Sequence, residues 1–463
     1  MGPTEAPGPP QVATAWLPPQ RPVSRGGSIP RTLVVADKFP PRLGGIQQYV
    51  ANLLARLPAE QIVVCAPARE DDAAAERDYD AALPYPVVRL GGSWLPTPTL
   101  ARRLREVAHA EGCVTAWFGT AAPLALLGNA LRPGGIEHVV ASTHGHEVGW
   151  SRLPAVGPSG MRRIGSVVDV ITYLGPFTRP RLAQLVGPQI PLVRLPGGVD
   201  PDRFRPDCGG DEVRARLGLD DRPVVVSVSR LVRRKGQDTL IRAWPGIRAR
   251  CPEAQLLIVG HGVGRRRLER LADASGVTDS VVFTGAVAAE ELAAHYDAGD
   301  VFAMPCRTRL AGIEAEGLGI ANLEAAATGL PVITGASGGA PDAVLSGHTG
   351  QVVDGRDRDA LTDAVVDLLV DRDRARAWGV NGRAWVERRW HWDALAARMG
   401  NLLAGVLPDD DPDDLPLLPH PPAADPDAPV GRETRDDGAA GGPVDRETRA
   451  DSVPRAAGPG GGR

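Results

Sequence analysis

Two cationic side chains at the end of a predicted strand are the first candidates for chemistry. Arg230 and Lys235 follow the apolar run 224–229 and precede a predicted helix that begins near Gly236. A guanidinium offers a planar fork of donors and an ammonium a point charge, so this pair suits the binding of a diphosphate. Arg233 and Arg234 lie between them, and a solvated loop edge explains these two arginines equally well.

Two carboxylates, Glu316 and Glu324, flank the start of another predicted helix, which carries the run 323–327. Eight helical residues at about 1.5 Å rise would separate their Cα atoms by roughly 12 Å. The paired carboxyl groups of a retaining glycosidase lie about 5–5.5 Å apart. The spacing therefore argues against a hydrolytic pair and favours two groups that hold the ends of one extended ligand. Two solvated glutamates on a helix surface are the alternative.

Polar residues of two further loops could also contact a ligand. His144, His146 and Glu147 follow the apolar segment 138–142, but they lack the HExxH spacing and distant partners of a metal site. A polar contact to a substrate fits them better, with an ordinary loop as the alternative. Gly44 and Gly45 precede a predicted helix, where backbone N–H groups could approach an anion. A tight turn would also explain this pair.

Other acidic residues and the cysteines do not indicate a metal site or a disulfide framework. The Asp-x-Asp pairs 357/359 and 371/373 are explained by acids at the starts of helices, where the helix dipole favours negative charge. The five cysteines are scattered and odd in number, which favours buried thiols in a reducing compartment.

The elements that must position these residues form two series of apolar strands alternating with helices. Such alternation predicts parallel sheets covered on both faces, with ligands at the carboxyl ends of the strands. We therefore predict an α/β protein with two doubly wound, Rossmann-like domains facing a central cleft. The predicted strands are 33–36, 62–66, 87–90, 114–118, 138–142, 168–174, 224–229, 255–260, 280–285, 301–304 and 331–334. The predicted helices include 45–57, 98–110, 175–186 and a long run over 374–405.

Composition sets the predicted domain limits. These are a disordered extension at 1–30, a first Rossmann-like domain at 31–205, a second at 206–385, a helix crossing back at 386–407 and a disordered tail at 408–463. The net charge of −4 gives no indication of nucleic-acid binding. The first 30 residues lack the apolar core of a signal peptide, and no segment has eighteen uninterrupted apolar residues, so no membrane span is predicted.

Several of these segments, taken together, resemble the retaining glycosyltransferases of family 4, which have the GT-B architecture. The matching parts are GGIQQY at 44–49, THGHE at 143–147, SRLVRRKGQD at 229–238, the Glu316/Glu324 pair and SGGAP at 337–341. The resemblance covers roughly residues 31–405. The longer strings FPPRLGGIQ, HGHEVGWS and RTRLAGIEAEGLGI look like the actinobacterial branch that adds the second mannose to phosphatidylinositol mannosides from GDP-mannose.

The resemblance implies a role for each candidate residue. Arg230 and Lys235 would bind the donor diphosphate, Glu316 the sugar hydroxyls and Glu324 the ribose, while His144 would lie near the transferred sugar, with His146 the less suitable choice. The remaining donor-binding positions that it implies are Gly44, Gly45, Gly319 and Ile320. It also implies transfer with retention, a nucleotide-sugar substrate, and neither a metal nor a cofactor. Lys38, the segment around Leu310, and Asp342, where the family commonly carries Glu, depart from the pattern.

A lipid-linked acceptor is also implied, with peripheral contact at the cytoplasmic face of the cell membrane. The candidate docking surfaces are the helix 98–110, with Leu100, Leu104 and Val107 beside Arg102, Arg103 and Arg105, and the segment 161–164 near Trp150. The core face of an ordinary helix would show the same apolar spacing. The alternatives for function are a family 4 transferase with another nucleotide sugar or a soluble acceptor, and a GT-B sugar-nucleotide epimerase. The intact candidate residues argue against a catalytically silent binding protein.

Overall fold

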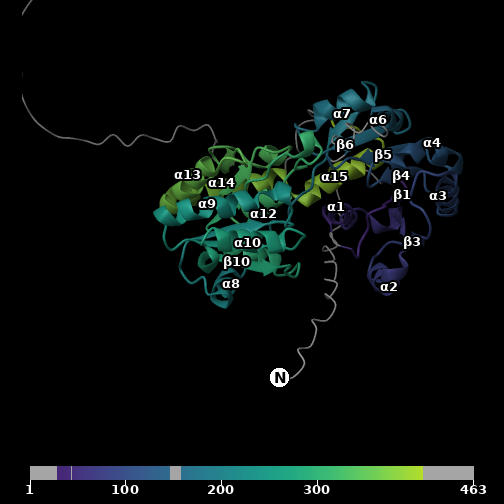
Figure 1. Ribbon diagram of the computed structural model, residues 1–463. Helices are drawn as coiled ribbons and strands as arrows, with labels where there is room; N and C mark the ends of the chain where they lie inside the picture. The colour runs from purple at the N-terminus through teal and green to yellow at the C-terminus, as the bar shows by residue number, and fades with distance from the viewer. Residues whose placement is uncertain (1–28, 43, 146, 148–157, 410–463) are drawn as a thin grey trace, which may run out of the picture. The chain divides into compact units, whose positions relative to one another are not determined.

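The computed structural model describes residues 29–42, 44–145, 147 and 158–409 (Figure 1). The segments predicted to be disordered, 1–30 and 408–463, fall almost wholly outside these residues, and so do His146 and Trp150. Ile29 belongs to the predicted extension but is buried. Two parallel sheets and the helices that cover them make up the described chain.

The first sheet has seven parallel strands in the order β3-β2-β1-β4-β5-β6-β7. Its strands are β1 (Thr32–Val35), β2 (Ile62–Pro67), β3 (Val87–Leu90), β4 (Thr115–Phe118), β5 (His138–Ser142), β6 (Val170–Tyr173) and β7 (Leu192–Arg194). In the centre, Val34 pairs with Val64 of β2 and with Trp117 of β4. Strand order reverses between β1 and β4, and such a switch point opens a crevice at the carboxyl ends of the strands.

The second sheet has six parallel strands in the order β10-β9-β8-β11-β12-β13. Its strands are β8 (Val224–Val228), β9 (Gln255–Val259), β10 (Val281–Gly285), β11 (Val301–Met304), β12 (Val332–Gly335) and β13 (Gly350–Val353). The corresponding switch point lies between β8 and β11. Both sheets belong to the predicted α/β class, although the short strands β7 and β13 were not among the predicted elements.

The helices cover both faces of each sheet. They are α1 (Gly45–Leu54), α2 (Ala73–Ala81), α3 (Pro98–Ala110), α4 (Gly128–Leu131), α6 (Pro158–Gly165), α7 (Arg179–Val186), α8 (Gly210–Leu217), α9 (Gln237–Arg250), α10 (Arg265–Ala274), α11 (Leu292–Asp297), α12 (Ile320–Ala327), α13 (Arg358–Val370), α14 (Arg372–Arg389) and α15 (Trp392–Leu403). Because strand side chains alternate between faces, Val225 of β8 packs in one core with α9, α10 and α13, while Val226 packs in another with α11 and α12. Figure 1 shows α9 beside α13 on the second sheet.

The run predicted over 374–405 is divided between two helices, α14 and α15, at Trp390 and His391. The second of them, α15, contacts α1, β4 and β5 of the first domain. Its buried apolar residues, among them Leu395 and Met399, join the core of that domain. The acids predicted to start helices do so, because Asp357 and Asp371 accept hydrogen bonds from backbone N–H groups at the starts of α13 and α14.

The prediction that apolar side chains of the segments 98–110 and 161–164 contact a membrane is wrong. Leu100 and Leu104 of α3 are buried in the core of the first domain, as are Met161 and Ile164 of α6. These side chains already cover the sheet, so they are not available to a membrane. Arg102, on the outer face of α3, forms an exposed ion pair with Glu106 one helical turn away.

Candidate active site

The turn that carries Lys235 is fixed against the end of β11. Residues Arg233–Lys235 form a 3-10 turn, and Gly236 then adopts a φ of 84° before α9 begins. A Cβ on Gly236 would lie 1.9 Å from the carbonyl oxygen of Pro305, so only glycine fits. The backbone N–H of Arg307 donates to the carbonyl of Arg234 over 2.8 Å. These contacts hold the turn after β8 against the loop after β11.

Arg234, Lys235 and Glu316 form a buried ion cluster, which we call the Glu316 clamp. The Nζ of Lys235 lies 2.9 Å from Oε2 of Glu316, and Nη1 of Arg234 contacts the same oxygen. The side chains of Lys235 and Glu316 are only 10% and 9% exposed. Burial acts to raise the pKa of Glu316, but the two cations outweigh it and hold that pKa below its usual value. The carboxylate is therefore ionised at neutral pH.

The backbone of Glu316 is held by the glycines that follow β12. The N–H of Gly339 donates to the carbonyl of Glu316 over 2.9 Å. A Cβ on Gly338, whose φ is 58°, would lie 2.0 Å from that same oxygen, and one on Gly339 would lie 2.2 Å from the carbonyl of Gly317. Side chains at 338 and 339 would thus push the clamp apart, which explains why the sequence has two glycines here.

Glu324 lies on α12 and has partners of its own. The hydroxyl of Tyr296 donates to Oε2 of Glu324 over 2.6 Å. Burial raises the pKa of Glu324, and the charges of Arg203 and Lys235 oppose that rise. The helix starts at Ile320, and its N-cap residue Gly319, with φ 80°, supplies no side-chain cap. The N–H groups of this first turn could therefore bind an anion.

His144 is held by three groups of the first domain. Its Nε2 lies 2.7 Å from the carbonyl oxygen of Gly119, which can only accept, so Nε2 carries the proton. Its backbone N–H donates to both carboxyl oxygens of Glu147, over 3.0 and 3.2 Å, and the ring of Tyr49 packs edge-on at 5.0 Å. Burial raises the pKa of Glu147, and the positive charges of His144 and Lys38 partly offset the rise.

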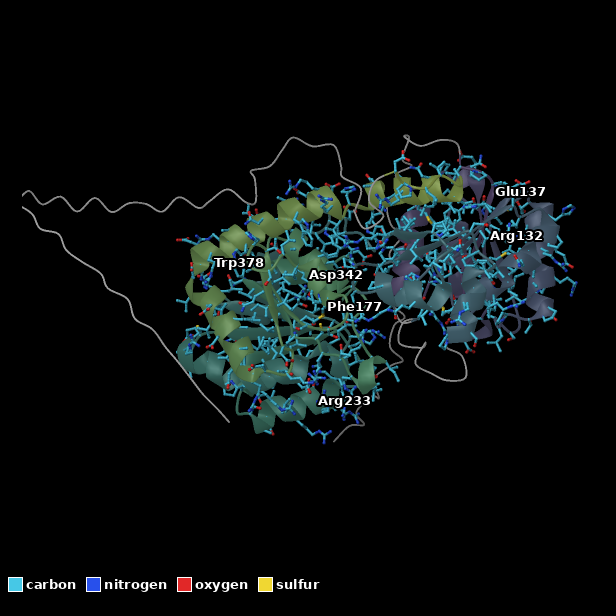
Figure 2. All side chains as sticks on the ribbon, turned by 90° about the horizontal axis from the view of Figure 1, so that it is seen from above. Arg132, Glu137, Phe177, Arg233, Asp342 and Trp378 are labelled. Carbon is cyan, nitrogen blue, oxygen red and sulfur yellow. The ribbon has the colours of Figure 1, made fainter. Side chains whose placement is uncertain are left out.

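Backbone contacts bring His144 next to the Glu316 loop. A Cβ on Gly317 would lie 3.0 Å from the carbonyl oxygen of His144, and one on Gly145 would lie 3.2 Å from Cα of Gly317. A second contact joins the segments that follow β6 and β12, because the N–H of Phe177 donates to Oδ2 of Asp342 over 3.2 Å (Figure 2). The predicted residues His144 and Glu316 therefore lie on adjoining loops.

Arg230, Gly44 and Gly45 are the remaining residues predicted to bind the donor, and Arg230 lines a cavity together with Arg234 of the clamp. Arg230 is exposed and lines an open cavity of about 570 Å³ beside the turn after β8. Gly44 is the N-cap of α1 and Gly45 its first residue, and no atom lies within 4 Å of a Cβ built on Gly45. This open N-terminus leaves room for a ligand, and the roles of these three residues in donor binding stay predictions.

Asp238 is a structural partner that the sequence did not reveal. Its carboxylate lies 2.8 Å from the guanidinium of Arg307 and 3.3 Å from those of Arg242 and Arg267. Burial would raise the pKa of Asp238, but Arg307 and Arg267 lower it. The only local signal was the i,i+4 pair with Arg242, since Arg307 is 69 residues away. Arg234, which could equally have been a solvated edge, is placed in the clamp.

Within residues 29–42, 44–145, 147 and 158–409, no group of three or more His, Cys, Asp or Glu side chains is placed to hold a metal ion. No helix in those same ranges combines the length and apolar character that a membrane span requires.

Two family models match the chain, and each covers one of the two domains. The model described as Glycosyltransferase Family 4 matches residues 43–203, and that described as Glycosyl transferases group 1 matches residues 210–385. The boundary between the matches falls between β7 and β8. Each sheet with its helices therefore corresponds to a known glycosyltransferase domain.

Curated relatives align along almost their whole length. A GDP-mannose-dependent alpha-(1-6)-phosphatidylinositol monomannoside mannosyltransferase of Mycobacterium tuberculosis is 52% identical over 81% of this chain and 98% of its own. A GDP-mannose-dependent enzyme of Corynebacterium glutamicum, named for a monoacylated form of the same acceptor, is 45% identical over 81% of this chain and 97% of its own.

Solved structures share the fold at low sequence identity. The HepE protein of Anabaena in complex with UDP superposes with a TM-score of 0.68 at 18% identity, covering 81% of this chain and 100% of its own. A sucrose-phosphate synthase of Thermosynechococcus elongatus gives a TM-score of 0.64 at 24% identity, covering 80% and 98%. At these identities the likeness concerns the fold alone.

Proposed function

The chain belongs to the family of GDP-mannose-dependent phosphatidylinositol monomannoside mannosyltransferases, and we propose that it transfers mannose from GDP-mannose to a phosphatidylinositol mannoside. The observation that carries this proposal is the 52% identity to a relative of that activity along 98% of the relative's length. Relatives named for D-inositol 3-phosphate as acceptor match less well, at 35% identity over 54% of their length. Their partial match favours the lipid acceptor.

The clamp supports a donor site for a nucleoside diphosphate sugar at the carboxyl end of β8. As the bond between C1 of mannose and the β-phosphate oxygen breaks, negative charge develops on the diphosphate. Lys235 and Arg230 would stabilise that charge, a role typically worth about tenfold to a thousandfold in rate. Ionised Glu316 would accept hydrogen bonds from sugar hydroxyls, Glu324 would contact the ribose, and the first turn of α12 at Gly319 and Ile320 would face the phosphates.

We propose transfer with retention of configuration. The acceptor hydroxyl would attack C1 from the face that the diphosphate leaves, and its proton would pass to the departing phosphate oxygen, so that the products are GDP and the dimannoside. Ion pairing keeps Glu316 ionised, so this carboxyl is not arranged as the acid of a hydrolytic pair, and Glu324 accepts its hydrogen bond from Tyr296. His144, which contacts the Glu316 loop, would lie near the transferred sugar.

We further propose that the reaction needs no metal ion and no bound cofactor, because Arg230 and Lys235 supply the positive charge that a metal would otherwise bring. Addition of EDTA should leave the rate of GDP release unchanged within about twofold. A rate that falls with EDTA and returns with Mn²⁺ or Mg²⁺ would contradict a metal-free reaction. An equal rate without additions, with EDTA and after addition of either metal would support it.

The lipid part of the proposed acceptor supports a reaction at a lipid surface. We propose that the chain contacts the cytoplasmic face of the cell membrane peripherally, since its acceptor is anchored there by acyl chains. The supporting observation is the name of the acceptor in its relatives.

A matrix of donors and acceptors tests the proposed function. GDP-mannose, GDP-glucose and UDP-glucose would each be offered with phosphatidylinositol monomannoside, with inositol phosphate and without acceptor, while nucleotide release is recorded. We expect release only with GDP-mannose and the lipid acceptor, and an α-linked product by NMR. Release without acceptor would favour an epimerase or hydrolase, and preference for a UDP-sugar or for inositol phosphate would favour another transferase.

A further inference from the structure

An arginine-lined cavity lies beside the Glu316 clamp on the second domain. It holds five guanidinium groups and a single carboxylate. The charged residues lining it are Arg230, Arg233, Arg234, Arg267, Arg309 and Glu314. Arg309 is paired with Glu314 at 2.8 Å, Arg267 with Asp238 at 3.3 Å and Arg234 with Glu316 of the clamp, so among the described residues only Arg230 and Arg233 of these five arginines have no ion-pair partner. A diphosphate bound by Arg230 and Lys235 leaves Arg233 without an assigned ligand.

Exposed aliphatic side chains belong to the cavity lining or to the loop between two of its lining residues. Val263 lines the cavity and is 98% exposed, while Leu310 and Ile313 are 57% and 38% exposed. Leu310 and Ile313 fall between Arg309 and Glu314, which both line the cavity. Single exposed aliphatic residues are common on protein surfaces, but three around one cationic cavity form a combined apolar and basic surface.

The loop that carries two of these side chains is closed at its base. Arg309 and Glu314 exchange backbone hydrogen bonds of 2.9 and 3.2 Å, in addition to their ion pair. Leu310 has a φ of 49°, a left-handed conformation that a bulky residue disfavours. The loop is thus held in a defined shape, and that shape leaves the leucine more than half exposed.

Helix α10 extends the cationic surface away from the cavity. Leu268 and Ala272 of this helix are buried against the sheet. Arg266 and Arg270 are exposed and stand four residues apart, so they share one outer face of the helix. Both follow Val263 in the chain and lie within three residues of the cavity residue Arg267. Helix α10 also carries Glu269, which is paired with Arg265, and the exposed Asp273, so its arginines outnumber its acids four to two.

We propose that this surface binds the anionic phospholipid face of a membrane. We call it the docking face and define it as Val263, Arg233, Arg266, Arg270, Leu310 and Ile313. Its arginines would contact lipid phosphates, and its aliphatic side chains would enter the boundary between headgroups and acyl chains. The proposal rests on the proposed function for the lipid nature of the acceptor, but not on which sugar is transferred.

Two observations favour a membrane over other occupants. A nucleotide confined to the cavity would not explain the outward-facing Val263, Leu310 and Ile313, nor the arginines of α10. In addition, the apolar residues of the candidate surfaces on the first domain, such as Leu100 and Met161, are buried in its core. The docking face instead combines aliphatic exposure with basic charge, as surfaces at membrane interfaces do.

Co-sedimentation with vesicles tests the docking face. The full chain would be mixed with vesicles of phosphatidylcholine alone or of phosphatidylcholine with phosphatidylinositol, at low and high salt. Two variants remove its features, Val263→Ser/Leu310→Ser/Ile313→Ser and Arg266→Glu/Arg270→Glu. Val370→Ser/Val380→Ser is the matched control, because those valines are 68% and 69% exposed on other helices.

We expect the wild type to bind the phosphatidylinositol vesicles and to be released as salt screens the charges. One arginine near an anionic surface contributes about fivefold to partitioning, so Arg266→Glu/Arg270→Glu should bind at least about 25-fold more weakly. The serine variant should bind the vesicles roughly tenfold or more weakly, and the control should bind like the wild type. Equal sedimentation of all four proteins, or a wild type that stays in the supernatant at low salt, would overturn the proposal.

Two further measurements separate this inference from the proposed function. GDP affinity by calorimetry should be the same in the wild type and both docking-face variants, which excludes a damaged donor site. Mannose transfer should be retained with a short-chain, detergent-dissolved acceptor and reduced with an acceptor embedded in vesicles. Transfer that fails with both acceptors in the wild type contradicts the proposed function, while the vesicle-binding result still decides on the docking face.

Discussion

At the scale of single residues, the clamp joins structural and chemical roles in one carboxylate. Glu316 is buried and would be costly to ionise alone, yet Lys235 and Arg234 make ionisation favourable. The same two cations face the end of β8, where the donor diphosphate is proposed to bind. Arg230 has a different position, because it is exposed on the wall of the open cavity. Loss of Lys235 should therefore affect folding as well as rate, while loss of Arg230 should affect rate alone.

Lys235→Ala and Arg230→Ala should each lower kcat for mannose transfer by about tenfold to a thousandfold, because each removes one charge that stabilises the leaving diphosphate. Steady-state GDP release gives the rate, and thermal melting shows whether the fold survives. Arg248→Ala is a suitable control, since Arg248 pairs with Asp279 on the surface of α9. If either active-site variant transfers mannose at the rate of the control, the residue changed in that variant does not belong to the donor site.

The ion pairs of Glu316 predict a specific dependence of stability on pH. Its pKa is lower in the folded protein than in the unfolded chain, so acidification favours unfolding. This contribution is complete above the unfolded pKa of about 4.3 and is lost as the pH falls through the folded pKa. Glu316→Gln should destabilise by about 1–3 kcal/mol at pH 7, the scale of a hydrogen bond to a charged group. Urea unfolding at several pH values should show the difference from wild type shrinking below about pH 4.3, and a constant difference would contradict the assignment.

At the scale of elements, glycines let three loops meet at the carboxyl edge of the second sheet. Gly236 holds the turn after β8 against Pro305, and Gly338 and Gly339 hold the turn after β12 against the backbone of Glu316. The loops after β8, β11 and β12 therefore position the clamp through backbone contacts as much as through side chains. Such contacts require positive φ or the absence of Cβ, and this is why glycine stands at these positions.

Gly236→Ala should destabilise the fold and reduce transfer, whereas Gly276→Ala should only destabilise it. Both glycines have positive φ, 84° and 65°, and an alanine there costs about 1–2 kcal/mol. A Cβ at 236 would also meet the carbonyl of Pro305, while one at 276 has no atom within 4 Å. Unfolding in urea and the kcat of each variant measure the two effects. Equal losses of stability and unchanged activity in both would show that the close contact does not position the clamp.

Much of the element order could be predicted from the sequence because buried parallel strands are continuous apolar runs. The helix at 98–110 has its predicted limits, and the two predicted Rossmann-like domains of the GT-B type are present. The short strands β7 and β13 were missed, since three or four residues at a sheet edge carry little pattern. The division of the long helical run at His391 was also missed, because no proline or glycine marks it.

The candidate site was predicted in its residue types but not in its pairings. Position at strand ends singled out Lys235 and Glu316, yet nothing in the sequence showed that they touch, since 81 residues separate them. The contacts of Asp238 with Arg307 and of Tyr296 with Glu324 are likewise formed only by the fold. Exposed aliphatic residues such as Leu310 cannot be told from buried ones by spacing, which is also why α3 was proposed as a membrane surface.

At the scale of the whole molecule, the last helix completes the core of the first domain. Helix α15 follows α14 of the second domain, yet its buried residues join the core that contains α1. The hydroxyl of Thr115 on β4 donates to the carbonyl of Leu403 over 3.1 Å. Nε2 of His138 on β5 lies 2.9 Å from the carbonyl oxygen of Leu402. The first sheet is therefore covered by residues from both ends of the described chain, and its stability depends on how α15 is held.

Asp393→Ala should loosen α15 and destabilise the first domain. The guanidinium of Arg56 is 1% exposed, and its Nε lies 2.7 Å from Oδ1 of Asp393, which is 32% exposed. Removing the carboxylate leaves a buried charge with hydrogen bonds only to the Asn52 carbonyl and side chain among its described contacts. The expected loss is about 1–3 kcal/mol, the cost of an unsatisfied charged group, reduced because Asp393 is partly solvated.

The matched control is Asp373→Ala on α14. The side chains of Asp373 and of its ion-pair partner Arg376 are 94% and 74% exposed, so this pair should contribute less than about 1 kcal/mol to stability. Urea unfolding gives the loss for each variant, and hydrogen exchange locates it. Faster exchange in α15, β4 and β5 is expected for Asp393→Ala, because the helix that covers those strands loses its charged anchor to α1. If the two variants unfold at the same midpoint, or if exchange rises only in the second domain, the Arg56–Asp393 pair does not hold α15 on the first sheet.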